Sequence, residues 1–131
     1  ELLDALTPEL DMAFFCQPNN PTGRVLPPAL LEAALARCAQ AGIFAVVDEC
    51  FLDFLDHAAA HSAKRYIATQ FGLLVVKAFT KLHAMAGLRL GYALCGDQWA
   101  ALGRVGPSPG GGNCGAAGAG LCGTGACPDP R

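Results

Sequence analysis

The chain has 131 residues, enough for one domain or part of one, and 53% of them are hydrophobic, which is ample for a buried core. Its formal net charge at pH 7 is −2, from nine basic and eleven acidic residues spread along the sequence. No cationic run could neutralise successive phosphates, so we expect no nucleic-acid partner. No apolar run reaches membrane-spanning length and the first residues do not resemble a signal peptide, so we expect a soluble, cytoplasmic protein without membrane contacts.

Cysteine is frequent, but its pattern predicts neither a disulfide framework nor a metal site. The number is odd, and no two cysteines have the C-x-x-C spacing of a zinc ribbon. We therefore expect reduced thiols, mostly buried at the first four positions. His57 and His61 could share a helix face, but no third ligand supports a metal site. The seven cysteines are Cys16, Cys38, Cys50, Cys95, Cys114, Cys122 and Cys127.

The first half of the chain predicts a strand, a loop, a helix and a second strand. The apolar residues 12–16 predict a strand, and residues 17–23, dense in turn formers, predict a loop. Apolar residues at helical spacing between Pro28 and Gly42 predict a helix of about four turns, since proline is tolerated in a first turn and glycine is a common C-terminal cap. Residues 43–47 are a β-branched and aromatic run, typical of a strand buried on both faces.

The next part of the chain continues this alternation. Within the polar stretch 53–70, the alanine-rich part is expected to be helical. Residues 73–76 predict a buried strand that ends at Lys77, and residues 88–95 predict a fourth strand. Strands that alternate with helices predict an α/β fold with right-handed crossovers between parallel neighbours. In open sheets of this kind, ligands bind beyond the carboxyl ends of the strands.

Composition changes from Gly103 onward. The segment holds more than half of the chain's 16 glycines and almost no large apolar residue, so it cannot build a core. Its matches to G-x-G-x-x-G (118–123) and G-x-S-x-G (106–110) lack the strand–turn–helix context that nucleotide binding or a nucleophilic serine needs. We interpret residues 1–103 as the structured part, and residues 104–131 as a disordered tail or the product of a shifted reading frame.

Four motifs that could carry chemistry follow one another along the chain. They are PNNPTG at 18–23, DECF at 48–51, TK at 80–81 and GLRLG at 87–91. Together they resemble the fold type I pyridoxal-phosphate (PLP) enzymes of the aspartate-aminotransferase superfamily, most closely the threonine-phosphate decarboxylase branch and the related histidinol-phosphate aminotransferases. The resemblance covers roughly residues 1–100. It implies PLP as the cofactor and the central part of a large PLP-binding domain, with a mostly parallel sheet and flanking helices.

The resemblance assigns roles to five residues. Asp48 and Lys81 are the catalytic pair: the carboxylate keeps the ring nitrogen of PLP protonated, and the amine binds the aldehyde covalently. Arg89 grips the cofactor phosphate with its planar fork, and the Thr80 hydroxyl adds a phosphate hydrogen bond. Asn20 donates its amide to the phenolate oxygen. Without a cofactor, Asp48 would be a strand-end cap and Arg89 would form a surface ion pair. The order of the four motifs favours the cofactor roles.

Two positions depart from the pattern of the resembling enzymes. Phe51 stands where aminotransferases usually have tyrosine, which removes a hydroxyl from the phenolate oxygen and is typical of the decarboxylase branch. Ala78 stands where relatives commonly have serine or threonine, so phosphate binding is expected to lose one hydrogen bond, about 1 kcal/mol.

Other residues near these motifs have plainer interpretations. Asn20–Pro21 is a candidate for a cis peptide bond, because proline makes that isomer accessible. Lys64 and Lys77 are expected to be solvated surface groups, and His83 either lines the pocket or packs.

For the parent enzyme, the resemblance implies decarboxylation of L-threonine O-3-phosphate to an aminopropanol phosphate, in cobalamin biosynthesis. The substrate is then a small phosphorylated amino acid, and the full-length parent is expected to be a homodimer. Two alternatives stay open: a PLP-dependent aminotransferase such as one for histidinol phosphate, and an inactive truncated fragment. The family's ring-stacking residue and its substrate-carboxylate arginine are expected in segments other than this one.

Overall fold

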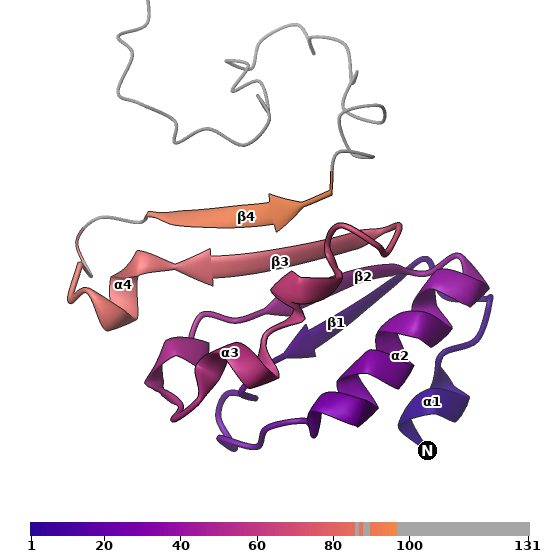
Figure 1. Cartoon of the computed structure of the whole chain (residues 1–131), viewed down its shortest axis with the longest axis horizontal. Helices are drawn as coiled ribbons and strands as arrows, with labels where there is room; N and C mark the ends of the chain where they lie inside the picture. The colour runs from indigo at the N-terminus through magenta and orange to yellow at the C-terminus, as the bar shows by residue number, and fades with distance from the viewer. Residues whose placement is uncertain (86, 88–89, 97–131) are drawn as a thin grey trace, which may run out of the picture.

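A computed structural model describes residues 1–85, 87 and 90–96. These residues form a four-stranded sheet with helices packed against one of its faces (Figure 1). The elements in chain order are α1 (Leu2–Ala5), β1 (Met12–Cys16), α2 (Pro28–Ala41), β2 (Phe44–Asp48), the 3-10 helix η1 (Leu52–Phe54), α3 (Ala58–His61), the 3-10 helix η2 (Ala63–Tyr66), β3 (Leu73–Ala78), α4 (Phe79–Leu82) and β4 (Gly91–Cys95).

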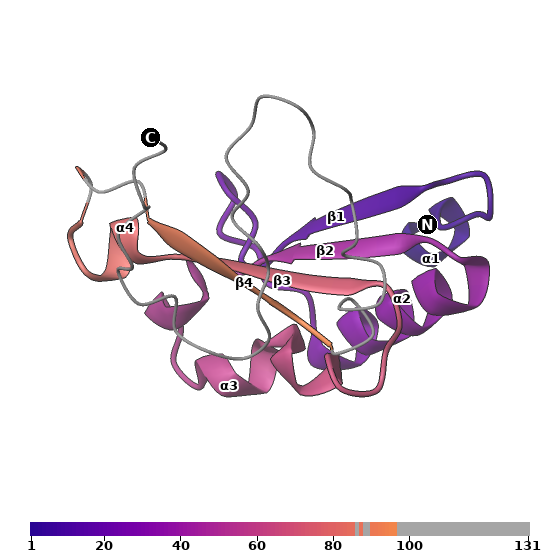
Figure 2. The same ribbon diagram turned by 90° about the horizontal axis from the view of Figure 1, so that it is seen from above.

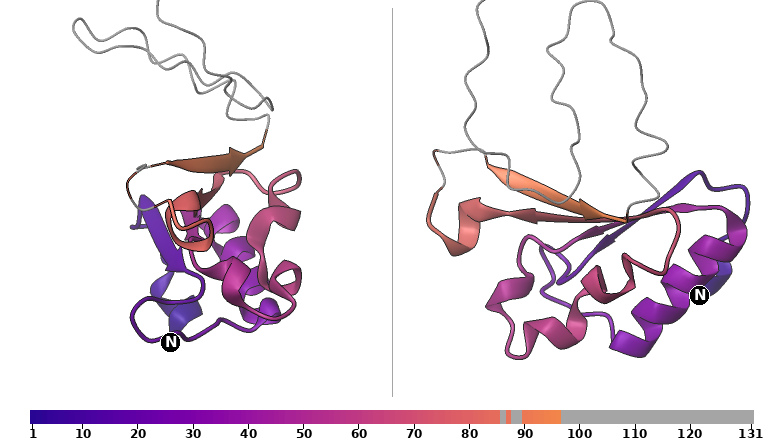
Figure 3. Two further views of the ribbon diagram at one scale, coloured as in Figure 1. Left: turned by 90° about the vertical axis from the view of Figure 1, so that its left-hand side faces the viewer. Right: turned by 45° about the horizontal axis from the view of Figure 1, so that its top comes forward.

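The sheet has the order β1-β2-β3-β4. The first three strands are parallel, and β4 pairs with β3 in the antiparallel direction. Both crossovers between the parallel strands pass on the same side, so α2 and α3 lie beneath the sheet in Figure 2 and in the right-hand view of Figure 3. The predicted α/β architecture with a mostly parallel sheet is therefore confirmed.

Helix α2 begins and ends where its sequence signals place it. Pro28 occupies the first turn, and Gly42 follows the helix with a φ of 73°, in the left-handed region that glycine adopts without steric cost. The Gly42 amide donates to the carbonyls of the last turn. The face that α2 turns to the sheet is buried, and its buried residues are Leu31, Ala34, Leu35 and Cys38.

The two faces of the sheet differ in burial. Ala45 and Val47 of β2 point toward the helices and belong to the hydrophobic core. On the opposite face Val46 is also buried, with 7% of its surface exposed, so the central strand is covered on both sides as predicted. The neighbouring strand is different: Phe14 of β1 is 73% exposed within the described residues. The open face of the sheet is therefore apolar at β1.

Several predicted boundaries shift in the structure. Strand β3 extends to Ala78, so Lys77 lies inside the strand and not after it. Strand β4 begins at Gly91; Leu90 precedes it, and residues 88–89 of the predicted strand lie outside the described residues. The alanine-rich helix is confirmed as α3. No helix in the described part of the chain is both long and apolar enough to cross a bilayer.

The first four cysteines are free thiols, as expected, but they are not mostly buried. Only Cys38, on the inner face of α2, is buried; Cys16 and Cys50 are partly exposed, and Cys95 near the end of β4 is exposed. The prediction was wrong because Cys16 and Cys50 lie at strand ends and β4 lies at the edge of the sheet. The other three cysteines and the 104–131 segment lie outside the described residues.

Candidate active site

The carboxyl ends of the three parallel strands meet at one edge of the sheet. Cys16 of β1 is paired in register with Asp48 of β2, and Asp48 with Val76 of β3. Asn20 lies in the loop after β1, Asp48 is the last residue of β2, and Lys81 lies in α4, which directly follows β3. Because parallel strands end at a common edge, residues far apart in sequence are gathered there.

Asp48 is held at the end of β2 by both backbone and side chain. Its carbonyl accepts a hydrogen bond from the Gln17 amide at 2.8 Å, which extends the β1–β2 pairing. Its Oδ1 accepts a hydrogen bond from the Cys50 amide at 2.9 Å, which fixes the carboxylate over the turn that follows the strand. Asp48 is partly exposed at this edge, so a ligand can reach it.

Lys81 approaches the same turn from the next strand. Strand β3 runs directly into α4, which carries Thr80 and Lys81. The Lys81 Nζ lies 5.9 Å from the centroid of the Phe51 ring, within the range of a cation–π contact. Phe51 follows Asp48 by three residues, so this contact brings the amine-bearing segment beside the acid-bearing turn. Lys81 is exposed and Thr80 is partly exposed.

The loop after β1 is built largely by its own turn residues. The Thr22 hydroxyl donates to Asn19 Oδ1 at 2.7 Å, and the Gly23 amide donates to the Asn19 carbonyl at 2.7 Å. The Asn20–Pro21 bond is cis, as predicted. Asn20 is exposed beside these residues, so its side chain is accessible to a ligand.

Gln17 anchors this loop, a role that sequence reasoning did not predict. The residue is fully buried, and both ends of its amide are used on Leu26: Oε1 accepts from the Leu26 amide at 2.9 Å and Nε2 donates to the Leu26 carbonyl at 3.1 Å. A buried amide that is satisfied at both ends fixes the entry and exit of the 17–26 loop.

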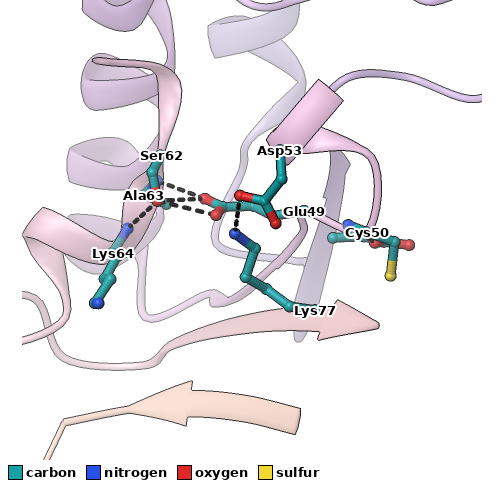
Figure 4. A network of polar contacts seen from close by, with 8 residues as sticks. Glu49, Cys50, Asp53, Ser62, Ala63, Lys64 and Lys77 are labelled. Carbon is teal, nitrogen blue, oxygen red and sulfur yellow. Dashed lines mark hydrogen bonds and ion pairs between the residues drawn. The ribbon is translucent and has the colours of Figure 1, made fainter. Parts of the chain in front are cut away.

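Sequence reasoning missed a second polar cluster, which is centred on Glu49 (Figure 4). Glu49 is only 1% exposed, and it accepts hydrogen bonds from the Ser62 hydroxyl at 2.9 and 3.1 Å and from the Ala63 amide at 2.6 Å. Burial raises the pKa of the Glu49 carboxyl, and the bonds from Ala63 and Ser62 partly oppose that rise. Strand alternation from buried Val47 is the signal that could have placed Glu49 on the inner face.

Lys77 belongs to the same cluster, contrary to its expected surface role. Its Nζ lies 2.8 Å from Asp53 Oδ1, and only 15% of its side chain is exposed. The prediction of a solvated lysine was wrong because β3 extends past position 76 and turns this side chain toward η1. Lys64 is exposed, as expected.

His83 was expected to pack or to line the pocket, and His57 and His61 were considered as metal ligands. The ring of exposed His83 lies 5.5 Å from the ring of Phe79, which supports the packing interpretation. Among the described residues, no group of three or more histidine, cysteine or acidic side chains could hold a metal ion. His57 has a φ of 58°, just before α3, and His61 ends that helix.

The structure thus places Asn20, Asp48, Thr80 and Lys81 in segments at one edge of the sheet. Arg89, the expected phosphate anchor, lies outside the described residues. PLP requires an acid that keeps its ring nitrogen protonated and an amine that reacts with its aldehyde. Asp48 lies at the end of one strand, and Lys81 lies beyond the end of the next. The described residues therefore fit PLP.

Comparison with known proteins also indicates a PLP-dependent enzyme. The chain belongs to the aminotransferase class I and II family, whose model matches residues 1–105. Enzymes of this family depend on PLP. The described fold is that of fold type I aminotransferases.

Three similar proteins illustrate the relationship. The threonine-phosphate decarboxylase of Salmonella typhimurium is 39% identical over 104 residues, which are 79% of this chain and 28% of that protein. Histidinol-phosphate aminotransferase 1 of Cupriavidus pinatubonensis is 37% identical over 90 residues, covering 69% of this chain and 24% of that protein. The crystal structure of L-threonine-O-3-phosphate decarboxylase from Porphyromonas gingivalis superposes with a TM-score of 0.60 at 25% identity, over 68% of this chain and 27% of that one. The chain therefore spans about a quarter of the length of its relatives.

Proposed function

We propose that the whole protein containing this chain decarboxylates L-threonine O-3-phosphate to an aminopropanol phosphate, with PLP bound at the edge formed by β1, β2 and β3. The observation that supports this most is the contact of Lys81 with Phe51, which places the amine beside the acid-bearing turn and beside a ring without a hydroxyl. The 39% identity to a threonine-phosphate decarboxylase favours this substrate. In this proposal the reaction is a step of cobalamin biosynthesis and takes place in the cytoplasm.

Each residue of the site has a task in this proposal. Bound PLP supplies an electron sink for the pair released when carbon dioxide leaves the substrate. Asp48 holds the proton on the ring nitrogen that makes the sink effective. Lys81 would hold the cofactor aldehyde, and its free amine would return a proton to the substrate carbon that lost the carboxylate.

The remaining residues hold the cofactor in place. Thr80 would bind its phosphate through the hydroxyl, and Arg89, which lies outside the described residues, would bind it through the guanidinium. Asn20 donates to the phenolate oxygen. Because Phe51 has no hydroxyl, this oxygen lacks the second donor that a tyrosine would offer, and it stays more basic.

The alternative is transamination of a phosphorylated substrate such as histidinol phosphate. It is favoured by the 37% identity to histidinol-phosphate aminotransferase 1 of Cupriavidus pinatubonensis. Either reaction uses Asp48 and Lys81 in the same way, and we propose a homodimer for the whole protein in both cases. The isolated 131-residue chain is expected to be inactive.

The deciding experiment supplies the purified whole protein and PLP with L-threonine O-3-phosphate, and in parallel with histidinol phosphate and 2-oxoglutarate. Release of carbon dioxide from the first substrate supports the decarboxylase. Formation of glutamate from the second substrate without carbon dioxide supports the aminotransferase. If neither carbon dioxide nor glutamate forms, both proposals are contradicted.

Lysine variants test the site itself. Lys81→Ala should abolish the visible absorbance of lysine-bound PLP and the activity, whereas Lys64→Ala, a matched change at an exposed lysine, should leave both unchanged. Retention of the lysine-bound absorbance in Lys81→Ala would show that another lysine holds the cofactor.

A further inference from the structure

Asp48 and Glu49 are adjacent in the chain but serve opposite faces of the sheet. The Glu49 amide donates to the Val76 carbonyl at 2.9 Å, so the extended β2–β3 pairing continues past Asp48. Side chains alternate along an extended chain, so Glu49 shares the inner face with Val47 and Asp48 points the other way. Any movement of Glu49 therefore moves the Asp48 backbone with it.

Glu49 is tied to a different part of the chain. The Ser62 hydroxyl and the Ala63 amide, which supply its three hydrogen bonds, belong to the turn that opens η2, 13 and 14 residues away. Bonds to a buried carboxylate are strong, because the group has no water to replace them. They hold the end of β2 against the layer beneath the sheet.

The Lys77–Asp53 ion pair makes the second tie. Lys77 lies on β3, four residues before Lys81, and Asp53 lies on η1, four residues after Glu49. Their 2.8 Å contact joins the segment that carries the amine to the segment that carries the acid. Figure 4 shows the two ties side by side.

We propose that Glu49, Lys77 and Asp53 form a positioning network that sets the placement of Asp48 relative to Lys81. Glu49 is the central positioning residue: it does not touch the cofactor, and it acts through the backbone of Asp48. The inference rests on the proposed function, because it concerns the same cofactor site. Misplacement of a reacting group by about 1 Å costs on the order of a hundredfold in rate, so a loosened strand end should be measurable.

The test uses the whole protein with Glu49→Ala, which removes all three hydrogen bonds, and Lys77→Met, which removes the ion pair but keeps most of the apolar stem. The matched control is Glu9→Ala, an exposed glutamate that precedes β1 at the opposite end of the strands. Four quantities are measured: the dissociation constant of PLP, the pH midpoint of the lysine-bound absorbance, and kcat and KM at saturating PLP.

We expect both network variants to bind PLP roughly tenfold to a hundredfold more weakly. At saturating PLP, kcat should fall more than KM changes and the pH midpoint should shift, because Asp48 and Lys81 no longer face the cofactor correctly. Glu49→Gln, which keeps a hydrogen-bonding side chain of the same length, should restore much of the affinity. Glu9→Ala should match the wild type in all four quantities.

Other outcomes contradict the inference. If the folded variants show only a lower melting temperature, with the dissociation constant, the midpoint and kcat unchanged, the network is merely structural. If even Lys77→Met fails to fold, the same conclusion holds. If the wild-type protein shows no lysine-bound absorbance, the proposed function itself fails, and this result is distinct from the other two.

Discussion

Gly91 of β4 faces the backbone of Lys77 on β3 so closely that no side chain fits between them. A Cβ at Gly91 would lie 2.8 Å from the Lys77 carbonyl oxygen, closer than such atoms approach in proteins. Gly91 is paired in register with Ala78, the last residue of β3, and the Phe79 amide donates to the Leu90 carbonyl at 3.1 Å. The absence of a side chain at Gly91 thus allows β4 to close against the segment that leads to Lys81.

The close contact between Gly91 and the Lys77 backbone leads to the first prediction. Gly91→Ala should lower the free energy of unfolding by about 1–3 kcal/mol, because the obstructing atom belongs to backbone that cannot move aside without breaking the β3–β4 pairing. Gly87→Ala is the matched control, since nothing lies within 4 Å of a Cβ at that position. Chemical denaturation of the two variants and the wild type measures the difference. Equal stability of the two variants would contradict the prediction.

The second prediction concerns pH and Glu49. Burial raises the pKa of this carboxyl above its ordinary value of 4.5, so the folded chain keeps the proton to a higher pH than the unfolded chain does. The stability that Glu49 contributes is then fully present below pH 4.5 and is lost as the pH rises through the raised pKa. Glu49→Gln cannot titrate and lacks this loss.

Denaturation curves at a series of pH values test this sign. The free energy of unfolding of the wild type minus that of Glu49→Gln should decrease as the pH rises above 4.5. A difference that increases with pH would mean that the hydrogen bonds from Ser62 and Ala63 outweigh burial.

Local signals explain the elements that were predicted correctly. The strand at 12–16 has the same bounds in the structure, because turn formers follow it directly. Helix α2 starts at Pro28 and stops before Gly42 because these two residues act on their own backbone. Such effects depend on neighbours in sequence, so they can be predicted from the sequence without knowledge of the fold.

The polar network could not be read in this way. Glu49 contacts residues 13 and 14 positions away, and Lys77 pairs with a residue 24 positions away, so each partner is set by how the chain crosses under the sheet. The motifs indicated which side chains carry chemistry at the edge of the sheet, because the resemblance supplies their roles. They do not indicate which residues pair with Glu49 and Lys77 on the inner face.

The third prediction tests the core beneath the site. Leu35 of α2 is 1% exposed and packs in the main cluster, so Leu35→Ala should cost about 2–5 kcal/mol of stability, from lost burial and the cavity that remains. Leu10→Ala, at a leucine that is 40% exposed, should cost much less. Thermal or chemical denaturation compares them, and similar losses would show that α2 does not pack on the sheet as described.

The fourth prediction concerns the thiol beside Asp48. Burial raises the pKa of the Cys50 thiol to about 12, and its hydrogen bond and proximity to the Asp48 carboxylate add to the rise. Because the thiolate is the reactive form, Cys50 should react with iodoacetamide at pH 8 roughly a hundredfold more slowly than the exposed Cys95, after allowance for the greater nucleophilicity of a more basic thiolate. Peptide mass spectrometry over a time course measures both rates.

An Asp48 variant separates the two causes of this low reactivity. Asp48→Asn removes the negative charge but keeps the size of the side chain, so the Cys50 thiol should become more acidic and its alkylation should accelerate, while the rate at Cys95 stays constant. If Cys50 in Asp48→Asn reacts as slowly as in the wild type, burial alone protects the thiol. The carboxylate then does not lie against Cys50, and the described orientation of Asp48 at the strand end is wrong.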